Sequence, residues 1–341
     1  MQRGLALGLA SLLLPSSLAV AEPKSVSDKA TKSETSARCE LRGTARPPTN
    51  ATIAGPDGRT IARFSGSELE LSVLELSRTP PLRARIETGT GRGSFRVHGF
   101  IDASLLPVFG ARDLAVVPGH LFLSAHRRLT IVGAEPDRVK VERKLSPPFE
   151  QTLSTWVACS ALELAEKAPP GFTPAGDARG YALRRASLEL FALGPGERRV
   201  VSLLHKAPEA DAVLFFSTET RDGFVHVAHR SDVVVDAWAR SSDLEALPRG
   251  ETLDQLAGST MRRSRPRLAV EGEPRSVRAT REVPLRNAAS DRAAVIGVIE
   301  PDADTYVLDV TAGWASVMPK SLAVFPAENA QFWVKASELG I

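Results

Sequence analysis

The chain contains few of the residues from which catalytic and redox sites are commonly built. Its 341 residues include two Cys, two Tyr, four Trp and six His. Its sequence also lacks the nucleophile-elbow, phosphate-binding-loop and zinc-ligand spacings. We therefore expect no catalytic residue, no cofactor and no metal site. The scarcity of tyrosine also argues against a groove for proline-rich peptides, because such grooves are lined with aromatic side chains.

The histidines do not form a metal-binding pattern. His226 and His229 lie three residues apart in an expected strand, so their side chains should point to opposite faces and cannot share one ion. His120 and His126 flank another expected strand, but no carboxylate stands near them in sequence. We expect all of them to be solvated or core histidines.

Positive and negative charges are nearly balanced. The chain has 43 Lys and Arg against 40 Asp and Glu, a net charge of +3. Domains that bind nucleic acids concentrate basic residues on one face, so we expect no nucleic-acid partner. The densest basic run, residues 261–267, could rest on an anionic wall polymer or membrane surface, although such runs are usually solvated. Its candidate binding residues are Arg262, Arg263, Arg265 and Arg267.

The first 21 residues have the features of a secretory signal peptide. Arg3 precedes an apolar run over residues 4–18, and Ala19-Val20-Ala21 forms a small-x-small cleavage site. This run is shorter than the roughly 20 apolar residues of a membrane span, and no later stretch approaches that length. We expect an exported protein, periplasmic or secreted, with no transmembrane span in the mature chain. Residues 22–38 should be a flexible leader, because they contain almost no apolar anchor.

A seven-position pattern occurs four times: an aromatic residue, a small aliphatic residue, two free positions, Ser, a free position and Leu. The copies cover residues 100–106, 156–162, 238–244 and 333–339. Their defining residues are Phe100, Ser104, Leu106, Trp156, Ser160, Leu162, Trp238, Ser242, Leu244, Trp333, Ser337 and Leu339. Recurrence at roughly domain-sized intervals is typical of a tandem array.

The segments between these motifs alternate apolar and polar residues, the period of strands with one buried face. The sequence therefore predicts an all-β protein of four copies, numbered one to four, joined by linkers rich in Pro, Gly and polar residues. The copies are residues 39–106 (the most divergent), 107–165, 181–247 and 279–341, with linkers at 166–180 and 248–278.

The motif itself is expected to close each copy. In a strand, the aromatic residue and its aliphatic neighbour face opposite ways, so the aromatic can cover the sheet while the aliphatic residue enters the core. The free positions and Ser suit a short 3-10 turn in which the hydroxyl satisfies a local backbone group. The final Leu would then begin a closing strand.

This ending resembles that of bacterial Src-homology-3 (SH-3-like) domains, in which Gly-Trp-Val precedes a short turn and a terminal apolar strand. Copy four is the most similar: residues 283–290 resemble the opening strand and polar loop, residues 294–299 the second strand, and residues 312–317, with Trp314, the Gly-Trp hairpin. Residues 222–227 repeat that hairpin in copy three, and residues 136–141 do so weakly in copy two. The Gly before the motif aromatic survives only as Gly99.

The resemblance implies a tandem array of small SH-3-like, partly open β-barrels. Such domains commonly accompany cell-wall hydrolases and bind wall peptides. The first and last strands of such a barrel lie together, so Cys39 and Cys159 could both approach the junction of copies one and two. A disulfide between them would close 120 residues and contribute about 4 to 5 kcal/mol. The alternative is two unpaired thiols.

Three functions remain open at this stage. The first is a non-enzymatic binding protein of the bacterial cell envelope, with peptidoglycan peptide or another envelope protein as its partner. The second is a scaffold that joins exported proteins through exposed strands or clefts between copies. The third is an enzyme with an unrecognised site.

Overall fold

The computed structural model describes residues 36–89, 93–192, 198–206, 212–248, 274–321 and 323–341. Strands form nearly all of the regular structure of these residues, and their only helices are four single 3-10 turns. The expected all-β class is therefore confirmed. No helix in the described ranges is long and apolar enough to cross a membrane. The expected signal peptide, and the leader up to residue 35, lie outside these ranges.

The first two copies follow one another without a linker. The strands up to the first motif turn are β1 (Ser36–Ala37), β2 (Leu41–Ala45), β3 (Thr52–Ala54), β4 (Thr60–Phe64), β5 (Leu69–Ser77), β6 (Arg83–Thr88) and β7 (Phe95–Asp102), followed by η1 (Ala103–Leu105). Copy two contains β8 (Val108–Gly110), β9 (Leu114–Val117), β10 (Leu121–Leu123), β11 (Arg128–Ala134), β12 (Arg138–Lys144), β13 (Thr152–Ala158), η2 (Cys159–Ala161) and β14 (Leu162–Glu163).

Residues 166–178 contain no strand or helix, and β15 begins within the last two residues of the segment 166–180 expected as a linker. Copy three contains β15 (Arg179–Leu183), β16 (Ser187–Ala192), β17 (Arg198–Leu204), β18 (Val213–Arg221), β19 (Phe224–Arg230), β20 (Val233–Arg240), η3 (Ser241–Asp243) and β21 (Glu245–Ala246). Copy four contains β22 (Arg275–Arg278), β23 (Val283–Arg286), β24 (Val295–Ile299), β25 (Asp304–Thr311), β26 (Trp314–Pro319), β27 (Val324–Pro326), β28 (Phe332–Lys335) and η4 (Ala336–Glu338). The second expected linker thus ends in a strand, because β22 pairs with β25.

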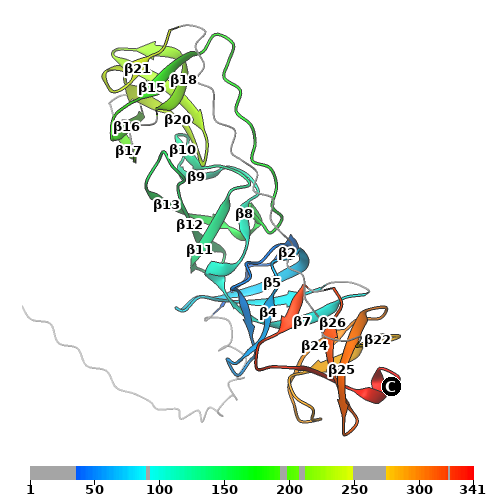
Figure 1. Ribbon diagram of the computed structural model, residues 1–341. Helices are drawn as coiled ribbons and strands as arrows, with labels where there is room; N and C mark the ends of the chain where they lie inside the picture. Colours follow the sequence, from blue (N-terminus) through cyan, green and yellow to red (C-terminus); the bar gives the residue numbers. More distant parts are fainter. Residues whose placement is uncertain (1–35, 90–92, 193–197, 207–211, 249–273, 322) are drawn as a thin grey trace, which may run out of the picture. The chain divides into compact units, whose positions relative to one another are not determined.

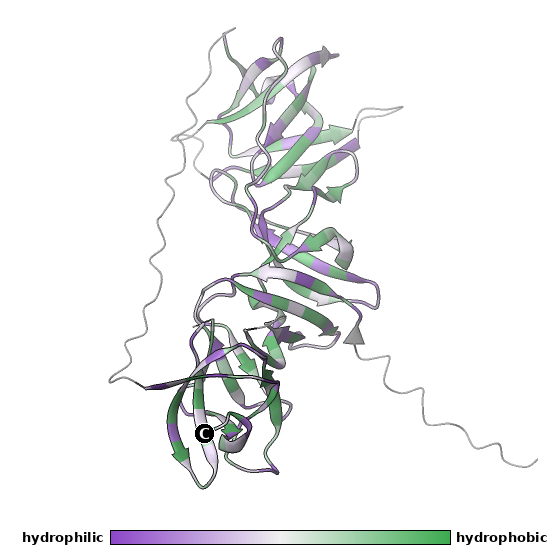
Figure 2. Cartoon of the chain, turned by 90° about the vertical axis from the view of Figure 1, so that its right-hand side faces the viewer, coloured by the Kyte–Doolittle hydropathy of each residue, from purple (hydrophilic) through white to green (hydrophobic). Residues whose placement is uncertain are grey.

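Each copy ends in a three-stranded antiparallel meander followed by a 3-10 turn. The four meanders are β5-β6-β7-η1, β11-β12-β13-η2, β18-β19-β20-η3 and β25-β26-β28-η4. The first hairpin of every meander contains a register shift. Apolar and polar residues alternate along the strands (Figure 2), and in β7 and β20 every second residue is buried. The repeated sequence motif therefore ends a repeated structural unit.

None of the described sheets closes into a barrel, so the array of separate small barrels is not observed. Strands pair between copies instead: β24 of copy four pairs with β7 of copy one, and β10 of copy two pairs with β20 of copy three (Figure 1). In addition, β27 of copy four pairs with β4 of copy one. The first residues of β7 and β20 pair with a strand of another copy, while their later residues pair along the same edge with β3 and β16 of their own copy. Copies two and three retain the expected pairing of first and last strands, β8 with β14 and β15 with β21.

Gly297 permits the pairing of β24 with β7. It lies opposite Val97 in the register of the two strands. A Cβ atom at this position would lie 1.9 Å from the carbonyl oxygen of Arg96, which is far inside van der Waals contact with backbone. The absence of a side chain therefore allows the two copies to share one sheet.

The disulfide between Cys39 and Cys159 is present, with the Cα atoms 5.5 Å apart. Cys39 is fully buried, and Cys159 is the first residue of η2. The expected pairing is confirmed, and the alternative of two unpaired thiols is wrong. The bond ties the start of copy one to the turn that ends the copy-two meander.

Candidate binding surface

The motif copies adopt one local structure. In every copy the 3-10 turn covers motif positions four to six, and the N–H of the final Leu donates to the carbonyl of position four. The N···O distance is 3.3 Å from Leu106 to Ala103 and 3.0 Å from Leu339 to Ala336. The 3-10 turn predicted from the spacing is therefore found at all four positions.

In copies one and three the hydroxyl of the motif serine contacts a carboxylate and not the backbone. Ser104 Oγ donates to Asp102 Oδ1 at 2.7 Å, and Ser242 Oγ lies 3.5 Å from Asp243 Oδ1. The backbone bond is made one position earlier in copy three, where Ser241 Oγ donates to the carbonyl of Gly223 at 2.9 Å. A neighbouring carboxylate thus replaces the expected backbone partner.

The aromatic residue lies outside the core and the aliphatic residue after it enters the core in three copies, as strand alternation predicted. The aliphatic residue after it is fully or nearly fully buried in three copies, as Ile101, Ala239 and Val334, and the final Leu is buried in all four. The aromatic side chains remain partly exposed, and Trp156 keeps 37% of its surface accessible. Alternation along the strand explains this arrangement: one face carries the core residues and the other carries the aromatics.

In copies one to three the motif aromatic lies opposite a basic or histidine residue on the preceding meander strand, whereas in copy four that partner is Ser316 and the basic partner lies on β23. We call these four the aromatic–basic pairs: Phe100 with Arg85, Trp156 with Lys140, Trp238 with His226, and Trp333 with Arg286. The rings of Trp238 and His226 have centroids 4.9 Å apart. The guanidinium of Arg138 also lies 5.1 Å from the centroid of Trp156. Cations beside aromatic faces are stabilised by the ring quadrupole.

The basic members differ in how far their charge is neutralised. Arg286 donates to the backbone carbonyls of Asp291 and Ala293, at 3.2 and 2.7 Å, so no carboxylate neutralises it there. Lys140 makes no ion pair among the described residues. Arg85 lies 3.7 Å from Glu75, and His226 lies 2.9 Å from Asp236. The pairs of copies two and four therefore present the least compensated positive charge.

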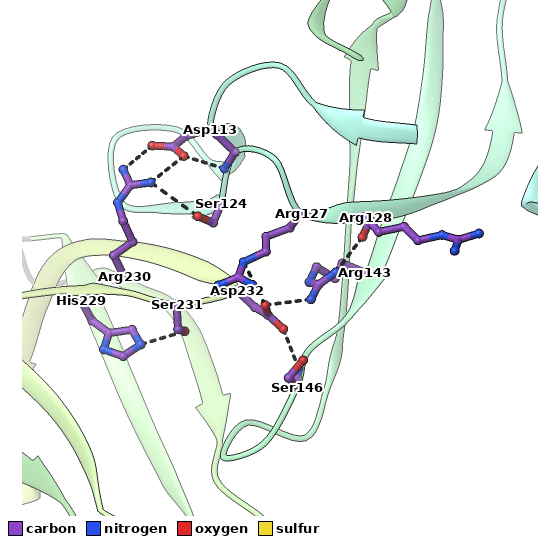
Figure 3. A network of polar contacts seen from close by, with 11 residues as sticks. Asp113, Ser124, Arg127, Arg128, Arg143, Ser146, His229, Arg230, Ser231 and Asp232 are labelled. Carbon is purple, nitrogen blue, oxygen red and sulfur yellow. Dashed lines mark hydrogen bonds and ion pairs between the residues drawn. The ribbon is translucent and has the colours of Figure 1, made fainter. Parts of the chain in front are cut away.

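A second group of polar residues joins copies two and three. Asp232, which is nearly fully buried, contacts Arg143 Nη2 at 2.8 Å and Arg127 Nε at 3.4 Å, and accepts the N–H of Ser146 at 2.8 Å (Figure 3). The Arg127 contact is an ion pair without hydrogen-bond geometry. Burial raises the pKa of the Asp232 carboxyl, but hydrogen bonds from Ser146 and Arg143 outweigh it and hold the pKa below its ordinary value.

A parallel contact lies beside it. Arg230 of copy three forms a bidentate pair with Asp113 of copy two, with N···O distances of 2.7 and 3.1 Å (Figure 3). Burial acts to raise the pKa of Asp113, but the hydrogen bonds from Arg230 and from the N–H of Ala125 outweigh burial and hold the pKa below its ordinary value. Both carboxylates are therefore anions that hold two copies together.

His229 lies next to this network. Its residue is partly exposed, but its ring packs against Phe149 and Phe215, with centroids 5.7 and 5.1 Å away. Its two ring nitrogens contact the Leu214 carbonyl at 2.7 Å and Ser231 Oγ at 2.9 Å. Burial lowers the pKa of His229, and the carbonyl opposes that shift only in part. The neutral ring is thus a structural element of copy three.

The remaining candidates from the sequence are the arginines of residues 261–267 and the histidines. Arg262, Arg263, Arg265 and Arg267 lie outside the described residues. Within the described ranges no group of three or more His, Cys, Asp and Glu could hold a metal ion. The fold does bring a carboxylate to His126, whose Nδ1 lies 2.6 Å from Oε1 of Glu163, a contact between residues 37 positions apart that the local sequence did not indicate.

No protein-family model, no curated protein and no solved structure is significantly similar to the chain. The functional argument therefore depends on the geometry of the aromatic–basic pairs.

Proposed function

We propose that the chain is an exported, non-enzymatic binding protein of the bacterial cell envelope, and that its Src-homology-3-like copies bind wall peptide. The observation that carries this proposal is the presence of an aromatic–basic pair in each copy, on the meander strand in copies one to three and on β23 in copy four. Trp and Arg are the residues that most often anchor protein interfaces, and a cation beside an aromatic ring suits a ligand with both a carboxylate and an apolar part. Wall peptides carry both.

The disulfide supports the exported location. Such bonds form and persist in oxidising compartments and are rare in the cytosol. Cys39 and Cys159 account for all the cysteine of the chain, and no free thiol remains.

A second candidate, a scaffold for other exported proteins, is favoured by a different observation. Sheet edges of this chain accept strands from sequence-distant segments, as β20 accepts β10 and β7 accepts β24. The same mode of pairing can recruit a strand of another protein.

Co-sedimentation of the mature protein with purified cell-wall sacculi tests the proposal. We expect binding that weakens as salt is raised, because exposed charges are screened. The double variant Lys140→Gln/Arg286→Gln should bind less than the matched control Lys144→Gln/Arg281→Gln, whose exposed cations lie away from the motif aromatics. Absence of binding, with one specific protein partner recovered instead, would favour the scaffold. Release of soluble wall fragments would show catalysis and contradict the proposal.

A further inference from the structure

A pocket of about 260 Å³ lies on copy one beside the first motif aromatic. Across its floor, Glu75, Arg85 and Phe100 are register partners on β5, β6 and β7. Its remaining wall residues include Pro56, Ser77 and Arg83. The pocket thus combines an aromatic face, two guanidinium groups and one carboxylate.

Arg83 is placed at the rim without an ion-pair partner. Asp102 is its register partner on β7, but no ion pair joins the two side chains in the described part of the chain. The carboxylate of Asp102 is instead turned into η1, where Oδ1 accepts the N–H of Ser104 at 2.9 Å and its hydroxyl at 2.7 Å. Ser77 Oγ accepts the backbone N–H of Arg83 at 2.7 Å, which fixes the strand start that carries this residue.

The charge balance of the pocket selects its ligand. Arg85 shares its charge with Glu75 over a long contact of 3.7 Å, so Arg83, Arg85 and Glu75 together leave one net positive charge. A guanidinium fork matches the two oxygens of a carboxylate. A single excess charge suits a monoanion, whereas Glu75 would repel a more highly charged group such as a phosphate dianion.

We infer that this pocket binds the C-terminal carboxylate of a peptide, with the carboxylate on Arg83 and Arg85 and a small terminal side chain against Phe100 and Pro56. A volume near 260 Å³ lies below the range of drug-sized pockets and accommodates a small peptide end rather than an extended molecule. The inference deepens the proposed function, on which it rests for the source of the peptide in the cell wall.

Isothermal titration of the mature, oxidised protein with acetyl-Ala-Ala-Ala tests the inference, with the C-terminal amide of the same peptide as the control ligand. We expect saturable binding of the acid and none of the amide. Arg83→Gln should weaken binding about tenfold. Arg42→Gln is the matched control, because it removes an exposed charge of the same copy on β2, outside the pocket, and should change the affinity less than twofold. Phe100→Leu, which keeps an apolar side chain, should also weaken binding.

Equal affinity for acid and amide, or equal losses in Arg83→Gln and Arg42→Gln, would overturn the inference. So would absence of saturable binding of the acid. Co-sedimentation with sacculi, measured in parallel, keeps the two proposals separate. If the wild-type protein sediments with the wall but does not bind the tripeptide, the pocket assignment fails while the proposed function stands. If it binds the tripeptide but not the wall, the pocket stands and the wall as its source is wrong.

Discussion

Replacing Asp232 by alanine should weaken the contact between copies two and three and lower the free energy of unfolding. The carboxylate is the shared partner of Arg143, at 2.8 Å, and Arg127, at 3.4 Å, and it accepts the Ser146 N–H at 2.8 Å. Without it, two guanidinium groups face each other and a backbone donor loses its acceptor. The side chain of Arg143 is only 15% exposed, so it cannot simply turn into water, whereas that of Arg127 is 35% exposed and can in part.

The expected magnitude follows from these contacts. Breaking a buried ion pair by removing one partner costs about 3 to 5 kcal/mol. The partial exposure of Arg127 places the effect at the lower end, at about 3 kcal/mol in the free energy of unfolding at pH 7. Because the pKa of Asp232 is lowered in the folded state, its contribution is present above its unfolded pKa and is lost as the pH falls through the folded value. Wild type and variant should therefore converge in stability only in strong acid.

Urea denaturation of the mature, oxidised protein, followed by tryptophan fluorescence, measures this difference. The matched control is Asp137→Ala, an exposed carboxylate of copy two that should change stability by less than about 0.5 kcal/mol. If Asp232→Ala and Asp137→Ala were equally stable at pH 7, the ionic network would not be what holds the two copies together.

Three further results are expected. Gly297→Ala should destabilise the protein by about 3 kcal/mol in urea denaturation, because the new Cβ atom would lie 1.9 Å from a backbone oxygen. The control Gly171→Ala, where nothing lies within 4 Å, should be nearly neutral. Equal effects of the two substitutions would contradict the β7–β24 pairing. Because the pKa of His229 is lowered in the folded state, the unfolded chain binds more protons, and the free energy of unfolding should fall as the pH drops below about 6.5. His229→Gln should flatten this part of the profile of stability against pH. An unchanged slope in the variant would exclude the His229 ring as its cause. Reduction of the Cys39–Cys159 bond, which spans 120 residues, should lower the free energy of unfolding by up to about 5 kcal/mol in the chain-entropy model. The Cys39→Ser/Cys159→Ser variant should not respond to reductant. A wild-type protein whose stability is insensitive to reductant would contradict the bond.

The local features of the fold could be predicted from sequence because they depend on neighbouring residues. Period-two alternation indicated the strands, and the motif spacing indicated a 3-10 turn at the position where each of the four turns occurs. Composition and compartment together favoured the single disulfide. Alternation also predicted that the motif aromatic and the aliphatic residue after it lie on opposite faces, with the aliphatic residue in the core, as the burial of Ile101, Ala239 and Val334 shows.

The joining of copies could not be predicted, because it depends on contacts between distant residues. Nothing near Gly297 in sequence indicates that this residue pairs with Val97 of β7, 200 positions earlier in the chain. The network around Asp232 likewise unites residues separated by 86 positions in the Ser146 contact. Arg83 became a candidate only when the structure turned its register partner Asp102 toward Ser104. Such sites emerge from the register of the sheets.

The most direct test of the central claim uses the tryptophans themselves. All four, Trp156, Trp238, Trp314 and Trp333, lie in the motif or in the hairpin beside it, and all are partly exposed. We predict that soluble wall peptides added to the mature protein shift its tryptophan emission to shorter wavelength and reduce quenching by acrylamide, because a ligand on the aromatic–basic pairs covers the indole rings. Unchanged emission and quenching at peptide concentrations that saturate binding would show that the ligand lies elsewhere and would contradict the account.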